Sequence, residues 1–533
     1  MGCALALLSV VACGGSKTDG VSGAAGNNAC SGPCAASGAP SSNGGASSEG
    51  SPGGADGALG GASAQGGAGH TYGPKYFRFG VNPGYYGPGI DRRESSQLSV
   101  AAGADSLRTT LPESYLKQWG DGIESEDYAS YTPLGLGHHV CFLIGPTREH
   151  SNAPASAQDY ELDHYSPKNL YQPIFLADGS VNPDNYWAAY VERVAKTYGQ
   201  YLDIYEVWNE PDQVGGNWQA TVAWDNAAPK PADLVWWNDS IFAYIRMLRI
   251  THEVVHRFDS DASVTVGGVG YGTFLSALLR YTDEPKAGAV SADFPDTAAK
   301  YLDIVSYHYY PVFGGGSSDK GVDGLIAARD DYRTRLSAAG AGERQFVVTE
   351  TGAPRYAVGG NVGGADYAAN YLVKALTLGH FEGLVGIDWF AQGDGAALGA
   401  SMDSFAYMGL YFDYSKATQV SDTKLSPQGQ AYAWLKTWLP NTAADPDALS
   451  ALALPESVRG AAFLTEQGHH LYVLWARTKD DESATASFSL PAAAPVTVHA
   501  FDLVKGAATT MLNPSGGKVS LSLSGLPTAF EAQ

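Results

Sequence analysis

Basic residues are scarce in this sequence, and no apolar run is long. The chain of 533 residues has 33 Lys and Arg against 55 Asp and Glu, which gives a formal net charge of −22. A field of that sign repels nucleic acid and anionic lipid headgroups, so we expect neither to bind through a basic surface. The acidic residues are scattered rather than gathered in blocks, which is typical of a solvated exterior.

Cysteine is also rare, with 5 residues in the whole chain. Cys30 and Cys34 lie where nothing predicts a fold around them, so they could pair in an oxidising compartment but do not indicate a metal site. Cys141 stands alone in an apolar run and is expected to be a small core residue. His138 and His139 lie at the start of a predicted strand, where residues usually serve stability. We therefore expect no metal and no organic cofactor.

The first residues resemble an export signal. The apolar run from Ala4 to Ala12 is too short to cross a bilayer as a helix, which takes roughly 20 apolar residues, but it suits a signal-peptide core. Val10-Val11-Ala12-Cys13 resembles a bacterial lipobox, which implies a lipoprotein signal peptide over residues 1–13 and lipidation of the Cys13 thiol. We expect an exported protein that is lipid-anchored at the bacterial cell envelope, on the outer membrane or the cell surface.

Residues 14–71 are dominated by Gly, Ala and Ser and show no hydrophobic periodicity. Such a segment cannot bury enough apolar surface to offset the loss of chain entropy on folding. We predict a disordered tether that lets the folded part reach outward from its anchor. The membrane is then a partner only through the N-terminal lipid.

From residue 72 to residue 440, short β-rich runs alternate with helical segments. Pro183 fits the first position of a helix, Asp233–Phe258 is apolar along one face, and Gly340 is a natural helix stop. Eight β-rich runs, several of them continuously apolar, predict a (β/α)₈ TIM barrel with loop insertions. The predicted strands are Tyr76–Val81, Ser106–Leu111, His139–Gly145, Ile204–Trp208, Val264–Val269, Leu302–Tyr310, Phe346–Glu350 and Leu384–Phe390.

The pattern changes after Pro440. Short runs, some of which alternate strictly between apolar and polar residues, are separated by Gly, Pro, Asp and Asn. Residues 441–533 are therefore predicted to form a small antiparallel β-sandwich. Its predicted strands are Ala461–Leu464, Leu471–Ala476, Ala484–Leu490, Val496–Phe501 and Val519–Leu523.

Two glutamates stand at the ends of predicted barrel strands. The fourth strand ends in Trp208-Asn209-Glu210-Pro211, and the seventh ends in Thr349-Glu350-Thr351-Gly352. Active sites of TIM barrels are built at the C-terminal ends of the strands, so both side chains are expected to point into the mouth of the barrel. A carboxylate at the end of a buried strand needs a partner or a purpose, because an unpaired buried charge is costly.

This pair of motifs resembles the signature of glycoside hydrolase clan A, with most similarity to families 5 and 39. The resemblance covers the whole barrel and implies that Glu210 is the general acid/base and Glu350 the nucleophile of a retaining glycosidase. The implied substrate is a β-linked glycosidic bond in a plant or microbial oligo- or polysaccharide. Further residues fall where the clan binds substrate or holds the nucleophile: Asn209, Arg108, His308, Tyr310 and Trp389.

The chemistry accounts for these residue types. Retaining hydrolysis uses two carboxyl groups about 5–5.5 Å apart on either side of the scissile bond. We expect the neighbouring negative charge to raise the pKa of Glu210, so that it can donate a proton. Asn209 is placed to bind the sugar 2-hydroxyl, and Trp389 to offer a flat face to the sugar ring.

Other interpretations remain open at this point. The two glutamates could be ion-paired structural groups, Arg108 a structural partner, and His308 and Trp389 packed core residues. The whole chain could be a non-catalytic glycan-binding protein on a glycosidase barrel, although a protein that only binds sugar has no need of both Glu210 and Glu350. A metal-dependent barrel hydrolase is disfavoured because His and Asp do not cluster at the predicted strand ends.

Overall fold

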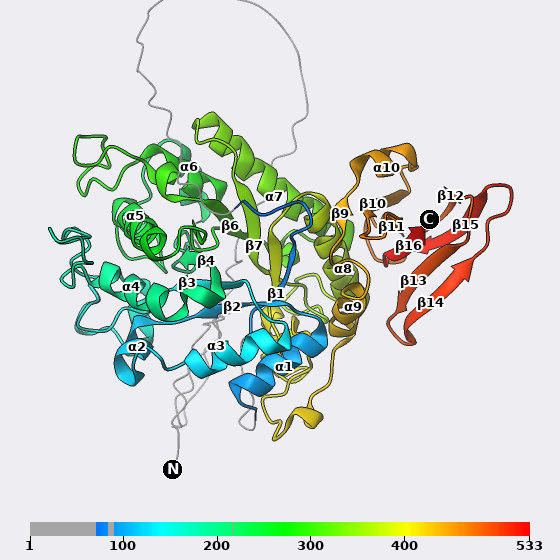
Figure 1. Ribbon diagram of the computed structural model, residues 1–533, viewed down its shortest axis with the longest axis horizontal. Helices are drawn as coiled ribbons and strands as arrows, with labels where there is room; N and C mark the ends of the chain where they lie inside the picture. Colours follow the sequence, from blue (N-terminus) through cyan, green and yellow to red (C-terminus); the bar gives the residue numbers. More distant parts are fainter. Residues whose placement is uncertain (1–70, 84–89, 217) are drawn as a thin grey trace, which may run out of the picture.

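The computed structural model describes residues 71–83, 90–216 and 218–533. The predictions for the signal peptide, for Cys13 and for almost all of the tether lie outside these residues. The described chain forms a barrel of strands with surrounding helices, followed by antiparallel sheets at the C-terminus, as predicted (Figure 1). Within the described ranges, no helix combines the length and the apolar character that a bilayer crossing requires.

The barrel consists of eight parallel strands in the order β5-β4-β3-β2-β1-β8-β7-β6. A parallel bridge between Val269 and Tyr307 brings the chain after β5 next to β6, so the sheet is nearly closed. Each predicted barrel strand is present, which confirms the predicted fold class. The strands are β1 Arg78–Val81, β2 Ser106–Thr110, β3 His139–Leu143, β4 Leu202–Val207, β5 Ser263–Thr265, β6 Ile304–His308, β7 Gln345–Thr351 and β8 Gly386–Trp389.

Capping residues set the first residues of the helices, and some helices therefore begin later than predicted. Helix α4 begins at Tyr186 because the Asn185 side chain caps it, so Pro183 is not its first residue as predicted. Helix α5 begins at Ile241 behind the cap Ser240, which leaves Trp236 and Trp237 in the preceding loop. The α-helices are α1 Arg92–Ala102, α2 Glu113–Trp119, α3 Ser125–Tyr131, α4 Tyr186–Tyr198, α5 Ile241–Phe258, α6 Gly272–Arg280, α7 Ser318–Ala338, α8 Ala365–Phe381, α9 Pro427–Leu435 and α10 Pro446–Ala451.

Short 3-10 helices lie in the connections between these elements. They are η1 Thr132–Leu134, η2 Asp159–His164, η3 Gly199–Tyr201, η4 Trp218–Asp225, η5 Pro231–Asp233, η6 Ala298–Tyr301, η7 Pro311–Phe313, η8 Ser404–Tyr407 and η9 Val420–Asp422.

The interior of the barrel is layered from apolar to polar along the strands. A small buried cluster near the N-terminal ends contains Val140, Ile204, Ile304 and Val347. Since alternate residues of a strand face the same side, the next inward positions on β4, β6 and β7 are polar: Glu206, Ser306 and Thr349. The apolar layer therefore forms the base on which a polar layer and the mouth of the barrel are built.

The C-terminal part pairs a six-stranded antiparallel sheet with a two-stranded one, in the orders β14-β13-β16-β11-β10-β9 and β12-β15. The predicted sandwich strands are all present, whereas β9, β14 and β16 were not predicted. Strand β14 has no alternating pattern because most of its residues are exposed at the sheet edge. The strands are β9 Ala443–Ala444, β10 Val458–Leu464, β11 His470–Ala476, β12 Thr485–Pro491, β13 Val496–Asp502, β14 Gly506–Leu512, β15 Lys518–Ser524 and β16 Thr528–Ala532.

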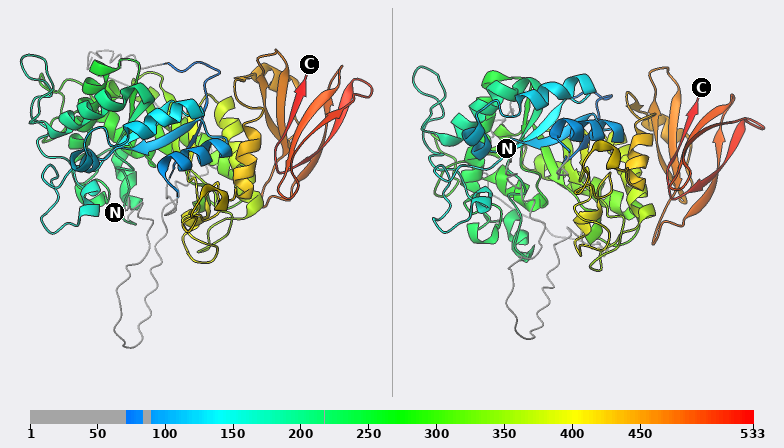
Figure 2. Two further views of the ribbon diagram at one scale, coloured as in Figure 1. Left: turned by 60° about the horizontal axis from the view of Figure 1, so that its bottom comes forward. Right: turned by 90° about the horizontal axis from the view of Figure 1, so that it is seen from below.

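The sandwich packs on the side of the barrel that carries α8 and α9, as all three views show (Figures 1 and 2). A buried polar cluster joins the two parts. Lys374 of α8 donates to Asp319 of α7 at 2.8 Å, and Asp319 also accepts from the Trp475 indole at 2.9 Å and from the Thr478 backbone at 2.8 Å. The Asp319 carboxylate therefore accepts hydrogen bonds from both parts and fixes this end of the sandwich to the barrel.

Candidate active site

A sharp turn after β4 aims Glu210 at the barrel mouth. Trp208 and Glu210 both adopt left-handed backbone angles, with φ of 72° and 44°. Such angles cost roughly 1–3 kcal/mol in a non-glycine residue and gather at functional sites. The turn is held by backbone hydrogen bonds from Trp208 to Leu143 (2.9 Å) and from Glu210 to Gly267 (2.6 Å). Neighbouring strands thus fix the position of Glu210.

Glu350 approaches Glu210 from β7, close to the end of that strand. One carboxylate oxygen of each glutamate and one ring nitrogen of His308 all lie within 4.8 Å of one another. The Glu210 side chain is 20% exposed and that of Glu350 is 13% exposed, so both remain open to solvent. The structure brings together the two glutamates that the sequence singled out.

Each oxygen of Glu350 has a donor of its own. Arg108 at β2 donates from Nη1 to Oε1 at 2.6 Å, and the Tyr310 hydroxyl donates to Oε2 at 2.6 Å. Burial and the charge of Glu350 raise the pKa of Tyr310 well above its ordinary value, so the phenol keeps its proton. Both residues were predicted to lie beside Glu350, and both contact it.

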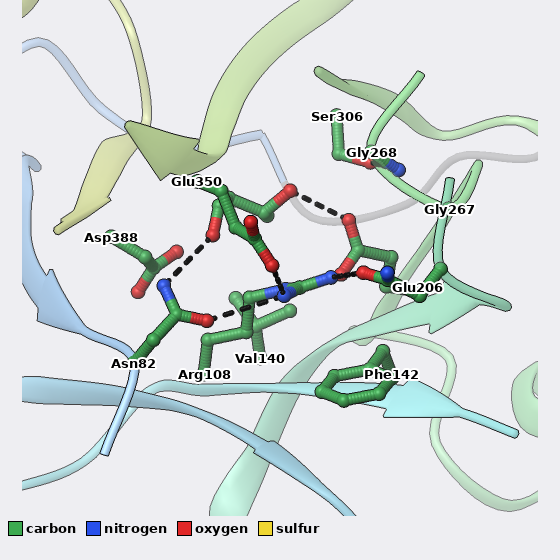
Figure 3. Close-up of polar contacts among 12 residues, drawn as sticks. Asn82, Arg108, Val140, Phe142, Glu206, Gly267, Gly268, Ser306, Glu350 and Asp388 are labelled. Atoms are coloured by element: carbon green, nitrogen blue, oxygen red, sulfur yellow. Dashed lines mark hydrogen bonds and ion pairs between the residues drawn. The ribbon is translucent and has the colours of Figure 1, made fainter. Parts of the chain in front are cut away.

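Arg108 is the centre of a buried network that the sequence prediction captured only in part (Figure 3). Its Nε donates to Glu206 at 2.7 Å, its Nη1 also to Asn82 at 3.2 Å, and its Nη2 to Asn209 at 2.7 Å. Its guanidinium lies over the Phe142 ring, 4.4 Å from the centroid. Burial opposes the charge, but Glu206 and Glu350 together raise the pKa of Arg108 above its ordinary value.

Asn82 and Glu206 are site residues that the sequence prediction missed. Glu206 is fully buried and accepts a hydrogen bond from the Thr349 hydroxyl at 2.6 Å, while Asn82 follows β1 and donates to the Thr349 carbonyl at 3.2 Å. The signal was present for Glu206, because it lies four residues before Glu210 on an apolar strand. An acidic side chain on the inner face of that strand requires a buried cation.

Burial is the main reason that the pKa of Glu210 rises to about 7. The positive charge of Arg108 opposes the rise, and the negative charge of Glu206 adds to it. The predicted direction is therefore observed, but the predicted cause, a neighbouring negative charge, is secondary to burial. At neutral pH a large share of Glu210 carries a proton.

His308 lies between the two glutamates and is closer to Glu210. Its Nδ1 is 2.7 Å from Glu210 Oε1 and 3.7 Å from Glu350 Oε2. Burial lowers the pKa of His308 to about 4, so the ring is neutral at neutral pH. A side chain on Gly268, where φ is +63°, would lie 2.0 Å from His308 Nε2, so this glycine makes room for the ring.

Trp389 does not provide the exposed stacking face that was predicted. It is fully buried, its indole donates to the Met408 carbonyl at 2.8 Å, and its ring packs near Tyr371. The next residue, Phe390, is partly exposed, and its ring centroid lies 6.1 Å from that of Tyr310. Strand β8 points Trp389 into the core, so Phe390 is the aromatic residue at this strand end that borders the site.

Other aromatic residues on the loops after the strands differ in their exposure. Trp218 is 45% exposed on η4, whereas Trp224 is buried and belongs to the core. Tyr85 and Tyr86 lie outside the described residues. Trp237 is buried in the core.

One possible set of metal ligands consists of Glu210, His308 and Glu350. A second set lies elsewhere, on α5 and directly before β6. In the first set, the positive charge of Arg108 already compensates the negative charge of Glu350, which disfavours binding of a further cation. The two histidines considered from sequence have other partners. His138 pairs with Asp203 at 2.7 Å, and His139 Nδ1 accepts from the Leu107 backbone at 3.1 Å.

No family model matches this sequence, and no curated protein matches it. Solved structures do resemble its fold. A family 39 glycoside hydrolase from the gut symbiont Bacteroides cellulosilyticus has a TM-score of 0.56 at 17% identity, over 85% of this chain and 80% of that one. A glucosidase from Croceicoccus marinus has a TM-score of 0.50 at 11% identity, over 88% of this chain and 98% of that one. The chain therefore resembles these two glycoside hydrolases in fold.

Proposed function

We propose that this protein is a retaining glycoside hydrolase with Glu350 as nucleophile and Glu210 as general acid/base. The observation that carries the proposal is the approach of the two carboxylates, with one oxygen of each within 4.8 Å. Retaining enzymes hold their carboxyl groups about 5–5.5 Å apart, whereas inverting enzymes leave roughly 6.5–9.5 Å for a water molecule. The separation therefore favours double displacement.

In the first step, a Glu350 oxygen attacks the anomeric carbon and the glycosidic C–O bond breaks. The leaving oxygen takes its proton from Glu210, whose pKa of about 7 keeps it partly protonated at neutral pH. Arg108 and Tyr310 hold the two Glu350 oxygens in fixed directions. This arrangement reduces the reorganisation that the attack requires.

In the second step, water displaces Glu350 from the anomeric carbon. The deprotonated Glu210 takes one proton from that water, and the sugar leaves with the configuration of the substrate. The neutral His308 ring, 2.7 Å from Glu210, orients this carboxyl group in both steps. No step requires a cofactor.

Asn209 is proposed to bind the sugar 2-hydroxyl. Its side-chain oxygen is engaged by Arg108, which fixes the amide plane and leaves its NH₂ group to donate. Phe390, rather than Trp389, is proposed as the aromatic surface next to the sugar ring. The proposed substrate is a β-linked bond in a plant or microbial oligo- or polysaccharide, which rests on the resemblance of the two Glu motifs to clan A.

A panel of 2-fluoro-glycosides, read by intact mass, tests this function. We expect one sugar to add its mass to the protein and the labelled peptide to contain Glu350. The Glu350→Gln variant should take no label, while a Trp218→Ala variant, altered outside the Glu pair, should still do so. A mass increase on another residue would refute the assignment of the nucleophile. Absence of label from every sugar would favour a glycan-binding protein.

We also propose that the protein is exported and held at the cell envelope by a lipid on Cys13. The support is the sequence Val10-Val11-Ala12-Cys13 behind a short apolar run. Expression in a bacterium fed with a radiolabelled fatty acid should label the wild-type chain and not the Cys13→Ala variant. Equal labelling of both chains would refute the anchor.

A further inference from the structure

A second cluster of possible metal ligands lies at α5 and the start of β6, away from the glutamate pair. His252 and His256 are one helical turn apart, and their stacked rings have centroids 4.2 Å apart. Asp303, directly before β6, faces both: His256 Nε2 is 2.9 Å and His252 Nε2 is 3.6 Å from its carboxylate. One ligand atom from each residue lies within 4.8 Å of the other two.

Two atoms of this cluster are buried without a hydrogen bond. Among the described residues, neither His252 Nε2 nor Asp303 Oδ1 has a hydrogen-bond partner, although the Asp303 side chain is only 1% exposed. A buried polar atom without a partner costs about 1–3 kcal/mol. The other carboxylate oxygen of Asp303, Oδ2, accepts from the Val264 backbone at 2.8 Å and lies 2.9 Å from His256 Nε2. The carboxylate is therefore fixed with its free oxygen, Oδ1, towards His252.

From this arrangement we propose that His252, His256 and Asp303 bind one divalent transition-metal ion of the zinc class. Two imidazoles and one carboxylate are ligands that Zn²⁺, Co²⁺ and Ni²⁺ accept, with water in the fourth position. Ligand atoms about 2.0–2.2 Å from a tetrahedral ion lie about 3.4 Å apart. The gap of 3.6 Å between His252 and Asp303 is close to that value. His256 would exchange its hydrogen bond to Asp303 for the ion.

The role of this ion is structural rather than hydrolytic. His252-Glu253-Val254-Val255-His256 fits the H-E-x-x-H pattern of zinc peptidases, in which the Glu acts as general base. Here Glu253 accepts a hydrogen bond from Arg249 at 2.7 Å and is not free for that role. Asp303 precedes β6, whereas His308 ends it, so the cluster lies at the opposite end of the barrel from Glu210. The ion would join α5 to the start of β6.

Metal titration of the untagged chain tests the proposal. The Cys30→Ser/Cys34→Ser background keeps the tether thiols from adding a site. After chelation, calorimetry with Zn²⁺ should give one equivalent bound, and Zn²⁺ should raise the melting temperature. Co²⁺ should give the visible absorption of a tetrahedral site. The His252→Gln variant should lose at least about 100-fold in affinity and show no rise in melting temperature.

Two matched variants separate this cluster from other histidines. His138→Gln removes a histidine paired with a carboxylate at the same end of the barrel, and Glu210→Gln removes a member of the other possible ligand set. Both should still bind one equivalent. Circular dichroism checks that His252→Gln is folded. Binding below one equivalent in the parent chain, or unchanged binding in folded His252→Gln, would overturn the proposal.

Discussion

Arg108 binds Glu206 and Glu350 at the same time, with its Nε 2.7 Å from the first and its Nη1 2.6 Å from the second. Glu206 is fully buried and Glu350 is partly exposed, so one guanidinium connects the core of the barrel to the carboxylate at its mouth. Because the planar group donates in several fixed directions, the position of Glu350 follows from that of β4. The predictions below test what this connection does.

Replacing Arg108 with Lys should disturb this connection while keeping the charge. A lysine cannot make the Nε and Nη contacts together, so Glu350 loses its fixed direction. We expect kcat to fall by roughly 10²-fold or more, as for a misplaced catalytic group. Steady-state kinetics measures the change, and a thermal melt separates it from unfolding. Full activity in Arg108→Lys would mean that charge alone suffices.

The two glutamates should respond differently to an external nucleophile. Glu350→Ala should lose on the order of 10⁴-fold or more in kcat, because the attacking group is gone. Azide should then restore turnover and give a glycosyl azide of inverted configuration, since it enters from the vacated face. With Glu210→Ala, azide should give a product of retained configuration. NMR of the products reads the outcome, and identical configurations from both variants would contradict the assigned roles.

The pH dependence should follow the protonation of Glu210. Burial raises its pKa to about 7. In the proposed mechanism, the acid form of Glu210 donates a proton to the leaving group. We therefore expect kcat/KM to fall as pH rises through about 7, with a slope of one proton. A substrate with a leaving group that needs no proton should lose this dependence in the first step. A profile that stays flat to high pH would show that the pKa of Glu210 is not raised.

The sequence predicted the barrel well because apolar runs mark the strands, and eight strands that alternate with helices are typical of this fold. Runs such as Phe346–Val348 are continuously apolar, which is typical of parallel strands that are buried on both faces. The pair Glu210 and Glu350 was predictable for the same reason, since strand ends meet at one mouth. Roles that depend on the direction of a side chain could not be predicted from the sequence. Trp389 and Phe390 are adjacent aromatic residues, and only the backbone at the end of β8 decides which one faces the core.

Contacts between residues that are far apart in the sequence could not be predicted either. Asn82 lies in an ordinary strand-end sequence, and its contact with Arg108 exists only once β1 and β2 are paired. The cluster on α5 is an intermediate case. His252 and His256 have a recognisable spacing, but Asp303 becomes their neighbour only through the packing of α5 against the start of β6.

The Tyr310→Phe variant should show how much one hydrogen bond to Glu350 contributes to kcat/KM. The phenol donates to Glu350 at 2.6 Å, and hydrogen bonds to charged groups contribute roughly 1.5–3 kcal/mol. We expect kcat/KM to fall about 10- to 150-fold, with little change in melting temperature, because the ring still packs on Phe405. If the variant matches the parent in activity, the bond does not contribute to catalysis.

The Lys374→Met variant should weaken the buried polar contact between the barrel and the sandwich. The lysine is fully buried, and its removal leaves Asp319 with Trp475, Thr478 and, at 3.3 Å, the guanidinium of Arg459 as partners. Breaking a buried ion pair costs roughly 3–5 kcal/mol when the remaining charge has no counter-ion, so with Arg459 still present we expect a loss below that range. Urea unfolding should show this loss, and removal of both charges in Lys374→Met/Asp319→Asn should recover part of it. A single variant as stable as the parent would mean that apolar packing, and not this ion pair, holds the two parts together.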